Sequence, residues 1–492
     1  MNYKAIGILM LLSIIRLSAQ TDQELAKTTV DKNEIEAHIY FLTDDLLKGR
    51  ETGTEGLKIA ASYLANVFRS YGVQPNPLNG TYYQEVSLIK KMPPVQIKLS
   101  LDNTEYSAVA PLESISAMYK GEAVNVGYGL ESDYTGKKVE GKFVICKGGS
   151  EAGNTARDAW RLRMQKQSLA KEKGALGVIE LLQANAEMWG FIEHDFNSSL
   201  FSVAKDGQTP ELPGFTYLWL HDPDGSLASR FDGKSTIPVQ YESDGQSLGS
   251  VTSQNVIGMV EGTDPQLKKE FIIYSAHYDH VGIGKPDETG DSIYNGARDN
   301  AVGTTTVLSM AENMSKYPTK RSALFILFTG EEKGLLGSEY YVEHPVVPLK
   351  QMVYCFNSDN GGYNNKSLAT IIGLTRTTAE KNITTAVAAF GLKAIEDPAP
   401  EQGLFDRSDN VHFAKKGIPA PTFSLGFESF DGDVTKYYHQ PGDEADTLDY
   451  DYLEQFFGAY VLAGRLLGND PETPFWVPGD SYEEAGKALY KE

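Results

Sequence analysis

The chain has 492 residues, of which 41% are hydrophobic, which is enough for sizeable buried cores. At roughly 150 residues per domain, this length predicts two or three domains. The 66 acidic residues outnumber the 45 basic ones and give a formal net charge of -21. This charge argues against nucleic acid or an anionic membrane as the partner, because both are polyanions that repel an acidic surface.

Residues 1–19 have the pattern of a secretory signal peptide. Lys4 supplies the positive start, residues 6–15 are mostly apolar, and Leu17-Ser-Ala19 offers a small residue at a cleavage site. The apolar stretch is shorter than the about 20 residues that a transmembrane helix needs, so no membrane insertion is expected. The mature chain is therefore expected to be an exported, soluble protein of the periplasm or the extracellular space.

The amino-terminal part of the chain predicts helices and then short strands. Helical patterns cover residues 34–47 and 56–71, and Gly72 follows the second one, where a helix end favours glycine. One stripe of the second helix consists of Ile59, Tyr63, Val67 and Tyr71. Prolines between residues 75 and 94 then separate short strands.

The character of the sequence changes between residues 107 and 246, where we expect an inserted domain. Residues 141–149 read as a strand that ends in a glycine turn, and residues 170–179 as a helix end that runs into a strand. This pair resembles the protease-associated domain, a small β-rich module without chemistry of its own. The catalytic domain is then expected in two parts, 20–106 and 247–468, followed by a tail at 469–492.

The cysteine content argues against a disulfide framework. Cys146 and Cys355 are the only cysteines, and both lie in apolar, strand-like runs. Two buried free thiols are therefore expected, although exported proteins often rely on disulfides. The tail at 469–492 contains three prolines and is expected to be loop with one short helix.

Polar clusters follow the most apolar runs of the sequence. The runs at 271–274, 323–328 and 352–356 predict strands that are buried on both faces of a parallel sheet. The candidate functional residues in the clusters are His277, Asp299, Glu331, Glu332 and Asp359. Because the carboxyl ends of parallel strands form the edge where the crevice of an α/β sheet lies, these side chains could converge.

Each of these residues has an ordinary structural explanation when it is taken alone. Asp299 could cap a helix, and the two glutamates could be solvated carboxylates in the first turn of another. Taken together, these residues indicate a metal site instead. His439, which follows the strand predicted at 420–425, adds a second imidazole to the set. Imidazole and carboxylate ligands without thiolate suit zinc, cobalt or manganese.

At these residues the sequence resembles metallopeptidase family twenty-eight, the co-catalytic di-zinc exopeptidases that include secreted bacterial aminopeptidases and glutamate carboxypeptidase. The segment Leu42–Arg50, with Gly53, resembles the amino-terminal signature of that family, and the central motifs match in order and approximate spacing. The resemblance covers residues 34–75 and 250–468. It implies a three-layer α/β/α fold with a mostly parallel mixed sheet, of the phosphorylase/hydrolase-like kind, interrupted by the protease-associated insert.

The resemblance also implies two zinc ions per chain and a role for each candidate residue. The implied ligands are His277 and Asp359 for one ion, Glu332 and His439 for the other, and Asp299 as a bridge. Glu331 is then the general base, and Asp279 is the carboxylate that orients the imidazole of His277. His280 reads as structural. The family often has a cis peptide after the bridging aspartate, here between Asp299 and Asn300.

The sequence departs from the family pattern at one position. Asn410, in Arg407-Ser-Asp-Asn410, stands where the family commonly has a histidine that lines the site. This replacement leaves the substrate preference near Asn410 open. His412 could take the place of that histidine, or it could be an ordinary histidine on a helix surface.

The predicted function is that of a zinc-dependent aminopeptidase that acts on peptides. A water between two cations is acidified toward hydroxide, and Glu331 takes its proton and returns it to the leaving amine. An acid-rich cleft suits the free amine of a substrate better than a carboxylate, which favours an aminopeptidase over a carboxypeptidase. A glutaminyl-peptide cyclase and a non-catalytic, receptor-like binding protein of the same fold stay open as alternatives.

A serine hydrolase is the alternative from another class of enzyme. Residues 245–249 match the G-x-S-x-G pattern of a nucleophile elbow around Ser247. That motif requires a helix directly after the serine, whereas residues 250–257 read as extended chain. The serine hydrolase is therefore the weaker hypothesis.

Overall fold

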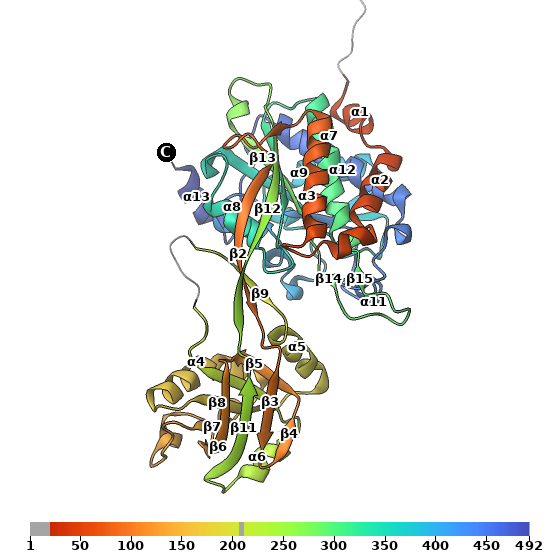
Figure 1. Ribbon diagram of the computed structural model, residues 1–492. Coiled ribbons are helices and arrows are strands. Elements are labelled where there is room, and N and C mark those ends of the chain that lie inside the picture. The colour runs from red at the N-terminus through yellow and green to blue at the C-terminus, as the bar shows by residue number, and fades with distance from the viewer. Residues whose placement is uncertain (1–19, 206–210, 492) are drawn as a thin grey trace, which may run out of the picture. The chain divides into compact units, whose positions relative to one another are not determined.

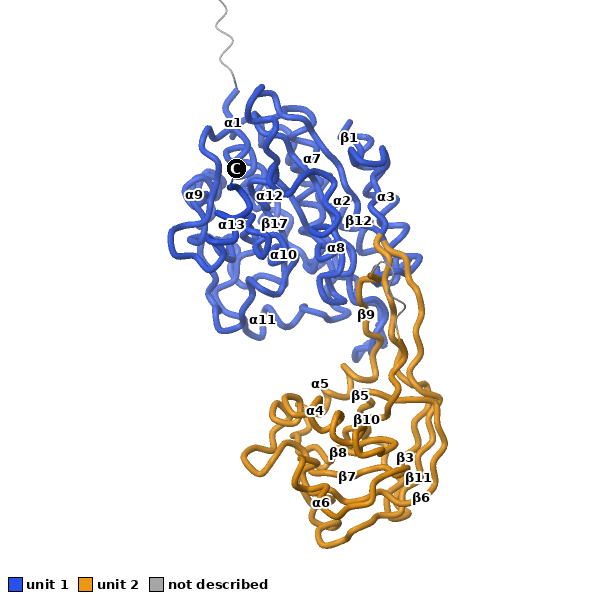
Figure 2. Tube along the Cα trace, turned by 90° about the vertical axis from the view of Figure 1, so that its left-hand side faces the viewer, with its two compact units in different colours: residues 1–85, 254–492 blue, residues 86–253 orange. Residues whose placement is uncertain are grey.

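The computed structural model describes residues 20–205 and 211–491. These residues form two compact units, one from the chain up to Glu85 and from Gln254 onward, the other from Val86–Ser253 (Figure 2). The insert predicted from composition was 107–246. The second unit extends beyond both limits because strands β2 (Tyr83–Met92) and β12 (Ser247–Val260) run through the boundaries without a break. The predicted signal peptide lies outside the described residues.

The larger unit is built on a mixed sheet. Its further strands are β1 (Gln74–Pro75), β9 (Leu200–Val203), β13 (Phe271–His277), β16 (Ser322–Phe328), β17 (Met352–Ser358), β18 (Leu368–Ile372), β19 (Lys393–Ile395) and β20 (Thr422–Leu425). The order is β19-β18-β20-β17-β13-β16-β12-β2-β9, with β1 beside β12 and with β9 and part of β2 and β12 contributed by the second unit. The central pairs β13–β16, β13–β17 and β17–β20 are parallel, whereas β12–β16 and β18–β20 are antiparallel.

Helices cover both faces of this sheet (Figure 1). They are α1 (Asp22–Lys27), α2 (Lys32–Leu42), α3 (Glu55–Tyr71), α7 (Gly303–Lys316), α8 (Leu336–Glu343), α9 (Glu380–Ala389), α10 (Asn410–Lys415), α11 (Gly432–Thr435), α12 (Tyr450–Asn469) and α13 (Glu483–Tyr490). Alternate residues of β13 enter different cores: Ile272 belongs to the core that includes residues of α2, α3, α7, α9 and α12, and Ile273 to the core that includes residues of α8 and α10. The predicted three-layer α/β/α fold is confirmed.

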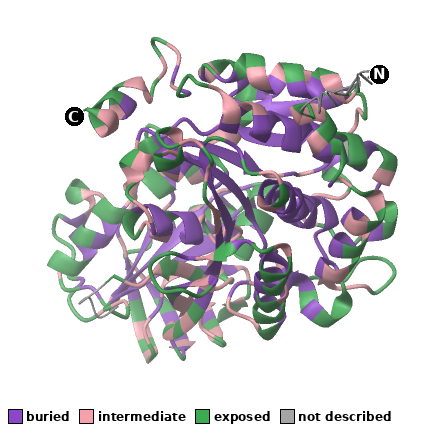
Figure 3. Cartoon of the chain, turned by 90° about the horizontal axis from the view of Figure 1, so that it is seen from above, coloured by how far each residue is buried: buried purple, intermediate pink, exposed green. Residues whose placement is uncertain are grey.

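The burial pattern follows from this layering. In Figure 3 the strands of the sheet are largely buried, while helices carry exposed residues on their outer faces. Every residue of β13, β16 and β17 is buried, as their near-continuous apolar runs predict. Cys146 and Cys355 are buried free thiols, which confirms that expectation.

The bounds of helix α3 follow the sequence pattern closely, with Thr54 at the N-cap and Gly72 ending it at a left-handed φ of 80°. In the stripe that the spacing singled out, Val67 is buried, Tyr63 and Tyr71 pack partly buried against the core, and Ile59 is 44% exposed. The centre of the buried face runs through Leu57, Leu64 and Phe68.

Helix α2 ends earlier than the apolar pattern predicts. It stops at Leu42, where the Thr43 hydroxyl donates to the carbonyl of Ile39 and Asp44 accepts the N–H of Leu46. These local side-chain hydrogen bonds compete with helical ones. The short 3₁₀ helix Asp45–Arg50 follows, so the end of the predicted helix 34–47 is corrected.

The second unit has a sheet of its own. Its strands are β3 (Ile97–Leu101), β4 (Thr104–Tyr106), β5 (Val109–Glu113), β6 (Ala117–Asn125), β7 (Phe143–Lys147), β8 (Gly177–Leu182), β10 (Thr216–His221) and β11 (Thr236–Ser243), in the order β4-β3-β11-β6-β7-β8-β10-β5. Helices α4 (Ala156–Glu172) and α5 (Ala186–Phe196) pack in one core and α6 (Ser226–Phe231) in another. A buried ion pair joins Lys166 to Glu180 at 2.5 Å. Among the described residues, no helix combines the length and the apolar character needed to cross a bilayer.

Candidate metal centre

The carboxyl ends of three central strands meet at one edge of the larger unit. His277 is the last residue of β13, Glu331 follows the end of β16, and Asp359 follows the end of β17. The Nε2 atom of His277 lies 3.2 Å from Oδ1 of Asp359 and 3.9 Å from Oε2 of Glu331. The side chains that the sequence placed at separate strand ends therefore converge in one group of possible metal ligands.

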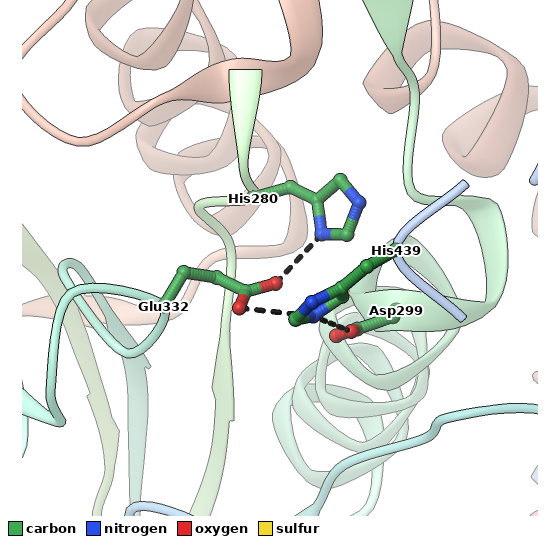
Figure 4. A group of neighbouring side chains, drawn as sticks. All are labelled: His280, Asp299, Glu332 and His439. Carbon is green, nitrogen blue, oxygen red and sulfur yellow. Dashed lines mark hydrogen bonds and ion pairs between the residues drawn. The ribbon is translucent and has the colours of Figure 1, made fainter. Parts of the chain in front are cut away.

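A second group lies beside the first and includes a histidine from a distant part of the chain (Figure 4). Nε2 of His439 lies 3.1 Å from Oε2 of Glu332 and 3.1 Å from Oδ2 of Asp299. His280 completes this group, with its Nδ1 atom 2.8 Å from Oε1 of Glu332. Four possible ligand atoms within 4.8 Å of one another can surround a single cation.

Asp299 connects the two groups. Its Oδ1 atom lies 3.3 Å from Nε2 of His277, and its Oδ2 atom faces His439 as described above. Asp299 belongs to the irregular turn Ala297–Val302, which leads into α7, and the peptide bond to Asn300 is cis, as the resemblance implied. The backbone N–H of Asp299 donates to the carboxylate of Asp443, so the turn is held from outside the site.

The chemistry of the donors fits divalent metal ions. The buried Nε2 atom of His439 makes no hydrogen bond with any residue that the structure describes, although two carboxylates lie close to it. Buried polar atoms normally have hydrogen-bond partners, so this nitrogen between two carboxylates indicates a ligand that the three groups share. Nitrogen and oxygen donors without thiolate are those that zinc and similar ions accept in hydrolytic sites.

The electrostatic environments of the two adjacent glutamates differ. Burial, together with Asp359 and Glu332, raises the pKa of Glu331 well above its usual value, although His277 opposes the shift. Burial and Asp299 also disfavour ionisation of Glu332, but His439 and His280 outweigh them and lower its pKa to about 2. Glu331 is therefore suited to hold a proton, whereas Glu332 stays a carboxylate.

A cavity of about 90 Å³ opens next to these residues. His277, Asp299, Glu331, Glu332 and Asp359 form one end of its wall. The remaining wall is mostly apolar and comes from the segments 361–372 and 404–438. A cavity needs about 10–15 Å³ of such volume to hold one water, so this one has room for a single side chain.

Comparison with known proteins agrees with this arrangement. Residues 255–462 match Peptidase family M28, and this range contains all seven residues of the two possible ligand groups. This part of the chain is thus similar to peptidase family M28. We call residues 255–462 the M28 region below.

Curated relatives match the chain over part of its length. Aminopeptidase YwaD of Bacillus subtilis (strain 168) is 31% identical over 211 residues, which are 42% of this chain and 42% of that protein. The probable leucine aminopeptidase 2 of Aspergillus oryzae (strain ATCC 42149 / RIB 40) is 32% identical over 93 residues, 19% of this chain and 16% of that one. The chain thus spans less than half the length of these relatives.

Solved structures share the fold over nearly the whole chain. An aminopeptidase from Aneurinibacillus sp. strain AM-1 has a TM-score of 0.61 at 22% identity and covers 94% of this chain and 99% of its own. BSAP, a zinc aminopeptidase from Bacillus subtilis, has a TM-score of 0.54 at 20% identity. The match covers 90% of this chain and 96% of BSAP. At this identity the likeness is one of fold.

Asp279 in the M28 region makes contacts that differ from those expected. Nδ1 of His277 lies 3.2 Å from the backbone carbonyl of Asp279 and 3.9 Å from its carboxylate. The carboxylate instead accepts a hydrogen bond from the hydroxyl of Thr52 at 2.8 Å and from the backbone N–H of Glu331 at 3.2 Å. Asp279 therefore fixes the backbone that carries Glu331, and its carbonyl is placed to fix the imidazole of His277.

Arg50 supports the M28 region from outside its bounds, a role that the sequence did not reveal. The buried guanidinium donates to the carbonyls of Tyr278, Asn295 and Gly296, and to that of Leu42. Tyr278 lies between His277 and Asp279, and Gly296 opens the turn that carries Asp299. The only sequence signal was the position of Arg50 at the end of the amino-terminal signature.

His280 lies closer to the metal centre than its reading as a structural residue implied. It is fully buried, and its Nδ1 atom is within hydrogen-bond distance of Glu332 while Nε2 has no partner among the described residues. The signal was present in the sequence, because His280 follows His277 by three positions. The sequence around one strand end does not show which of two nearby histidines points toward the metal centre.

The departure from the family pattern at Asn410 lies behind the cavity wall. The Asn410 amide donates to the carbonyls of Phe405 and Ala420 and does not line the cavity. His412 does not line it either, and burial with Lys415 lowers its pKa to about 4. Arg407 and Ser408 of the same motif do line the cavity. Ser247 begins strand β12, so the helix that a nucleophile elbow needs is absent there.

Proposed function

We propose that this protein is an aminopeptidase that binds two zinc ions. The observation that carries the proposal is the position of Asp299, which offers one carboxylate oxygen to each of two histidines, His277 and His439. A carboxylate with an imidazole at each oxygen is suited to bridge two cations. The related aminopeptidases and the zinc aminopeptidase with the same fold support zinc as the metal.

The ligand sets follow from the contacts around Asp299. His277 and Asp359 would hold one ion, and Glu332 and His439 the other. All five side chains of the proposed set offer nitrogen or oxygen atoms, as structural and catalytic zinc sites require. His280 would hold the carboxylate of Glu332 in place through Nδ1, in the way that outer groups orient metal ligands.

In this proposal Glu331 is the general base. When bound, the ions would acidify a water molecule and polarise the scissile carbonyl. Glu331 would accept the proton of the attacking water and deliver it to the leaving amine. Its burial and raised pKa support this role, because a carboxylate whose pKa is raised is a stronger base than an ordinary glutamate.

Two features support the removal of single residues from an amino terminus. The cavity of about 90 Å³ accommodates one side chain, which favours an exopeptidase over an endopeptidase. The carboxylates in its wall favour a substrate amine, because a positively charged terminus is attracted where a second carboxylate would be repelled. The substrates would therefore be peptides with a free amino terminus.

The remaining parts of the chain are assigned in the same proposal. Residues 1–19 would direct export to the periplasm or the extracellular space, and the catalytic domain, expected at 20–106 and 247–468, would be the larger unit, up to Glu85 and from Gln254 onward. The insert, expected at 107–246, would be a protease-associated domain that supplies no ligand. Both possible ligand groups lie outside this segment, which supports the assignment.

A panel of blocked peptides tests the function. Leucyl peptides with a free amino terminus should be hydrolysed by the zinc-loaded protein, and their N-acetylated counterparts should not. Amidation of the carboxyl terminus should leave cleavage possible, and a chelator should abolish it. Cleavage of acetylated peptides from the carboxyl end would identify a carboxypeptidase. Release of ammonia from glutaminyl peptides without cleavage would identify the cyclase.

A further inference from the structure

The cavity beside the metal centre has an apolar wall with one cationic side chain. Ile372, Leu404, Phe427 and Val434 supply apolar surface. Among the described residues that line the cavity, Arg407 is the only lysine or arginine. A side chain that enters this cavity therefore meets apolar surface along its stem and a guanidinium at one place.

The guanidinium of Arg407 is not engaged elsewhere. Arg407 is exposed, and its guanidinium makes no hydrogen bond or ion pair with any residue that the structure describes. Two other arginines of the M28 region differ in this respect, since Arg298 pairs with Asp443 at 2.8 Å and Arg376 with Asp480 at 2.7 Å. Arg407 is thus available to an incoming group.

The backbone that carries Arg407 is held firmly although its side chain is not. The N–H of Arg407 donates to the carbonyl of Leu404, and the Asn410 amide ties down the carbonyl of Phe405. Arg407 lines the same cavity as the metal-binding candidates His277, Asp299 and Glu332. A substrate side chain that enters this cavity from the metal centre therefore comes within reach of Arg407.

We propose that Arg407 binds a carboxylate of the substrate, so that the enzyme favours peptides with such a group near the scissile bond. The inference rests on the proposed peptidase function. The carboxylate could be the side chain of an amino-terminal glutamate or aspartate, or the carboxyl terminus of a dipeptide. A chain with a net charge of -21 repels anionic substrates in general, and a single guanidinium in the cavity wall offsets that repulsion locally.

The size of the effect follows from the kind of contact. A guanidinium and a carboxylate form two parallel, charge-assisted hydrogen bonds, which arginine supplies and lysine does not. Loss of such a contact corresponds to about a tenfold to hundredfold change in relative specificity. The specificity would be visible as a ratio of two substrates, so any common loss of activity cancels.

The experiment compares Arg407→Met and Arg407→Lys with the unchanged protein, all zinc-loaded with metal content checked. Arg161→Met, a surface change in the inserted unit, is the control. The substrates are the p-nitroanilides of glutamate and leucine, and the dipeptide Leu-Gly with a free or an amidated carboxyl terminus. We expect Arg407→Met to lower kcat/KM for one carboxylate substrate about tenfold to a hundredfold relative to its uncharged counterpart. Arg407→Lys should retain part of the preference and Arg161→Met all of it.

The two pairs of substrates identify the source of the carboxylate. A fall in the glutamate-to-leucine ratio assigns Arg407 to the side chain of the amino-terminal residue. A fall in the ratio of free to amidated Leu-Gly assigns it to the carboxyl terminus of a dipeptide. Unchanged ratios in Arg407→Met, with leucine p-nitroanilide still cleaved, would overturn the inference and leave the peptidase function intact. If the zinc-loaded unchanged protein cleaves none of the four substrates, the peptidase function itself fails, and this inference with it.

Discussion

Glu331 and Glu332 are adjacent in the chain, yet their carboxylates face different partners. Oε2 of Glu331 lies 3.9 Å from His277, and Oε2 of Glu332 lies 3.1 Å from His439. In the proposed mechanism the first moves a proton and the second holds a metal ion. Two residues with the same chemistry thus offer a matched pair of variants.

Glu331→Gln should keep both ions and lose most of the activity. The amide preserves the shape of the side chain but cannot accept a proton, a contribution worth typically 10²- to 10⁴-fold in rate. Glu332→Ala should instead bind metal more weakly, so excess zinc should recover part of its activity. Metal content and turnover are measured side by side for both variants. Loss of metal from Glu331→Gln together with full metal in Glu332→Ala would mean that the two roles are exchanged.

Replacement of Arg50 should destabilise the protein although Arg50 touches no proposed ligand. Arg50→Met leaves buried carbonyls without donors, among them those of Tyr278 and Gly296. Each unsatisfied group costs about 1–3 kcal/mol, so we expect the free energy of unfolding to fall by about 3 kcal/mol or more. Arg161→Lys, an exposed change, should shift it by less than about 0.5 kcal/mol. Chemical denaturation of the zinc-loaded proteins gives both values.

Zinc binding provides a second measurement on the same variant. Arg50 donates to the carbonyl of Tyr278, next to His277, and to that of Gly296, three residues before Asp299. Arg50→Met should therefore also bind zinc more weakly than the unchanged protein. An Arg50→Met protein with unchanged stability and unchanged zinc affinity would contradict the supporting role assigned to this residue.

Glu444 should make stability depend on pH. Burial, Asp45 and Asp291 raise its pKa to about 7, against a hydrogen bond from Asn295. Between about pH 4.5 and 7 the folded state then binds a proton that the unfolded state does not, so this residue makes stability fall as pH rises through that range. Glu444→Gln removes the contribution.

The pH prediction is tested by melting curves at several pH values with saturating zinc. The Glu444→Gln protein should have a higher Tm than the unchanged protein at pH 7.5, and the difference should vanish below about pH 4.5. Glu105→Gln, at an exposed strand position, serves as the control and should show no such pattern. Equal Tm differences at all pH values would exclude Glu444 as the source.

The strands and the convergence of the metal-binding candidates could be predicted from sequence because both depend on local patterns. Continuous apolar runs occur where strands are buried on both faces, and the polar residues after β13, β16 and β17 had to share one edge once those strands were parallel. The pattern also placed Gly72 at the end of α3, where a left-handed φ favours glycine.

What could not be predicted depends on contacts between distant segments. The face of α3 that is buried is chosen by packing against the sheet, so the spacing of Ile59, Tyr63, Val67 and Tyr71 did not show that Ile59 is exposed. Arg50 donates hydrogen bonds to backbone carbonyls more than 200 residues away. Every residue has a backbone carbonyl, so the sequence does not show which ones accept these bonds. The sequence placed Asn410 at a position that lines the site in the family. In the structure its amide donates to backbone carbonyls behind the cavity wall.

The number of zinc ions per active chain tests the central proposal most directly. Metal-free protein is titrated with zinc while bound metal and leucyl peptide hydrolysis are followed together. With Asp299 as a bridge, about two ions should bind per chain, and full activity should require the second. Full activity with a single ion bound per chain would contradict the bridged pair of ions.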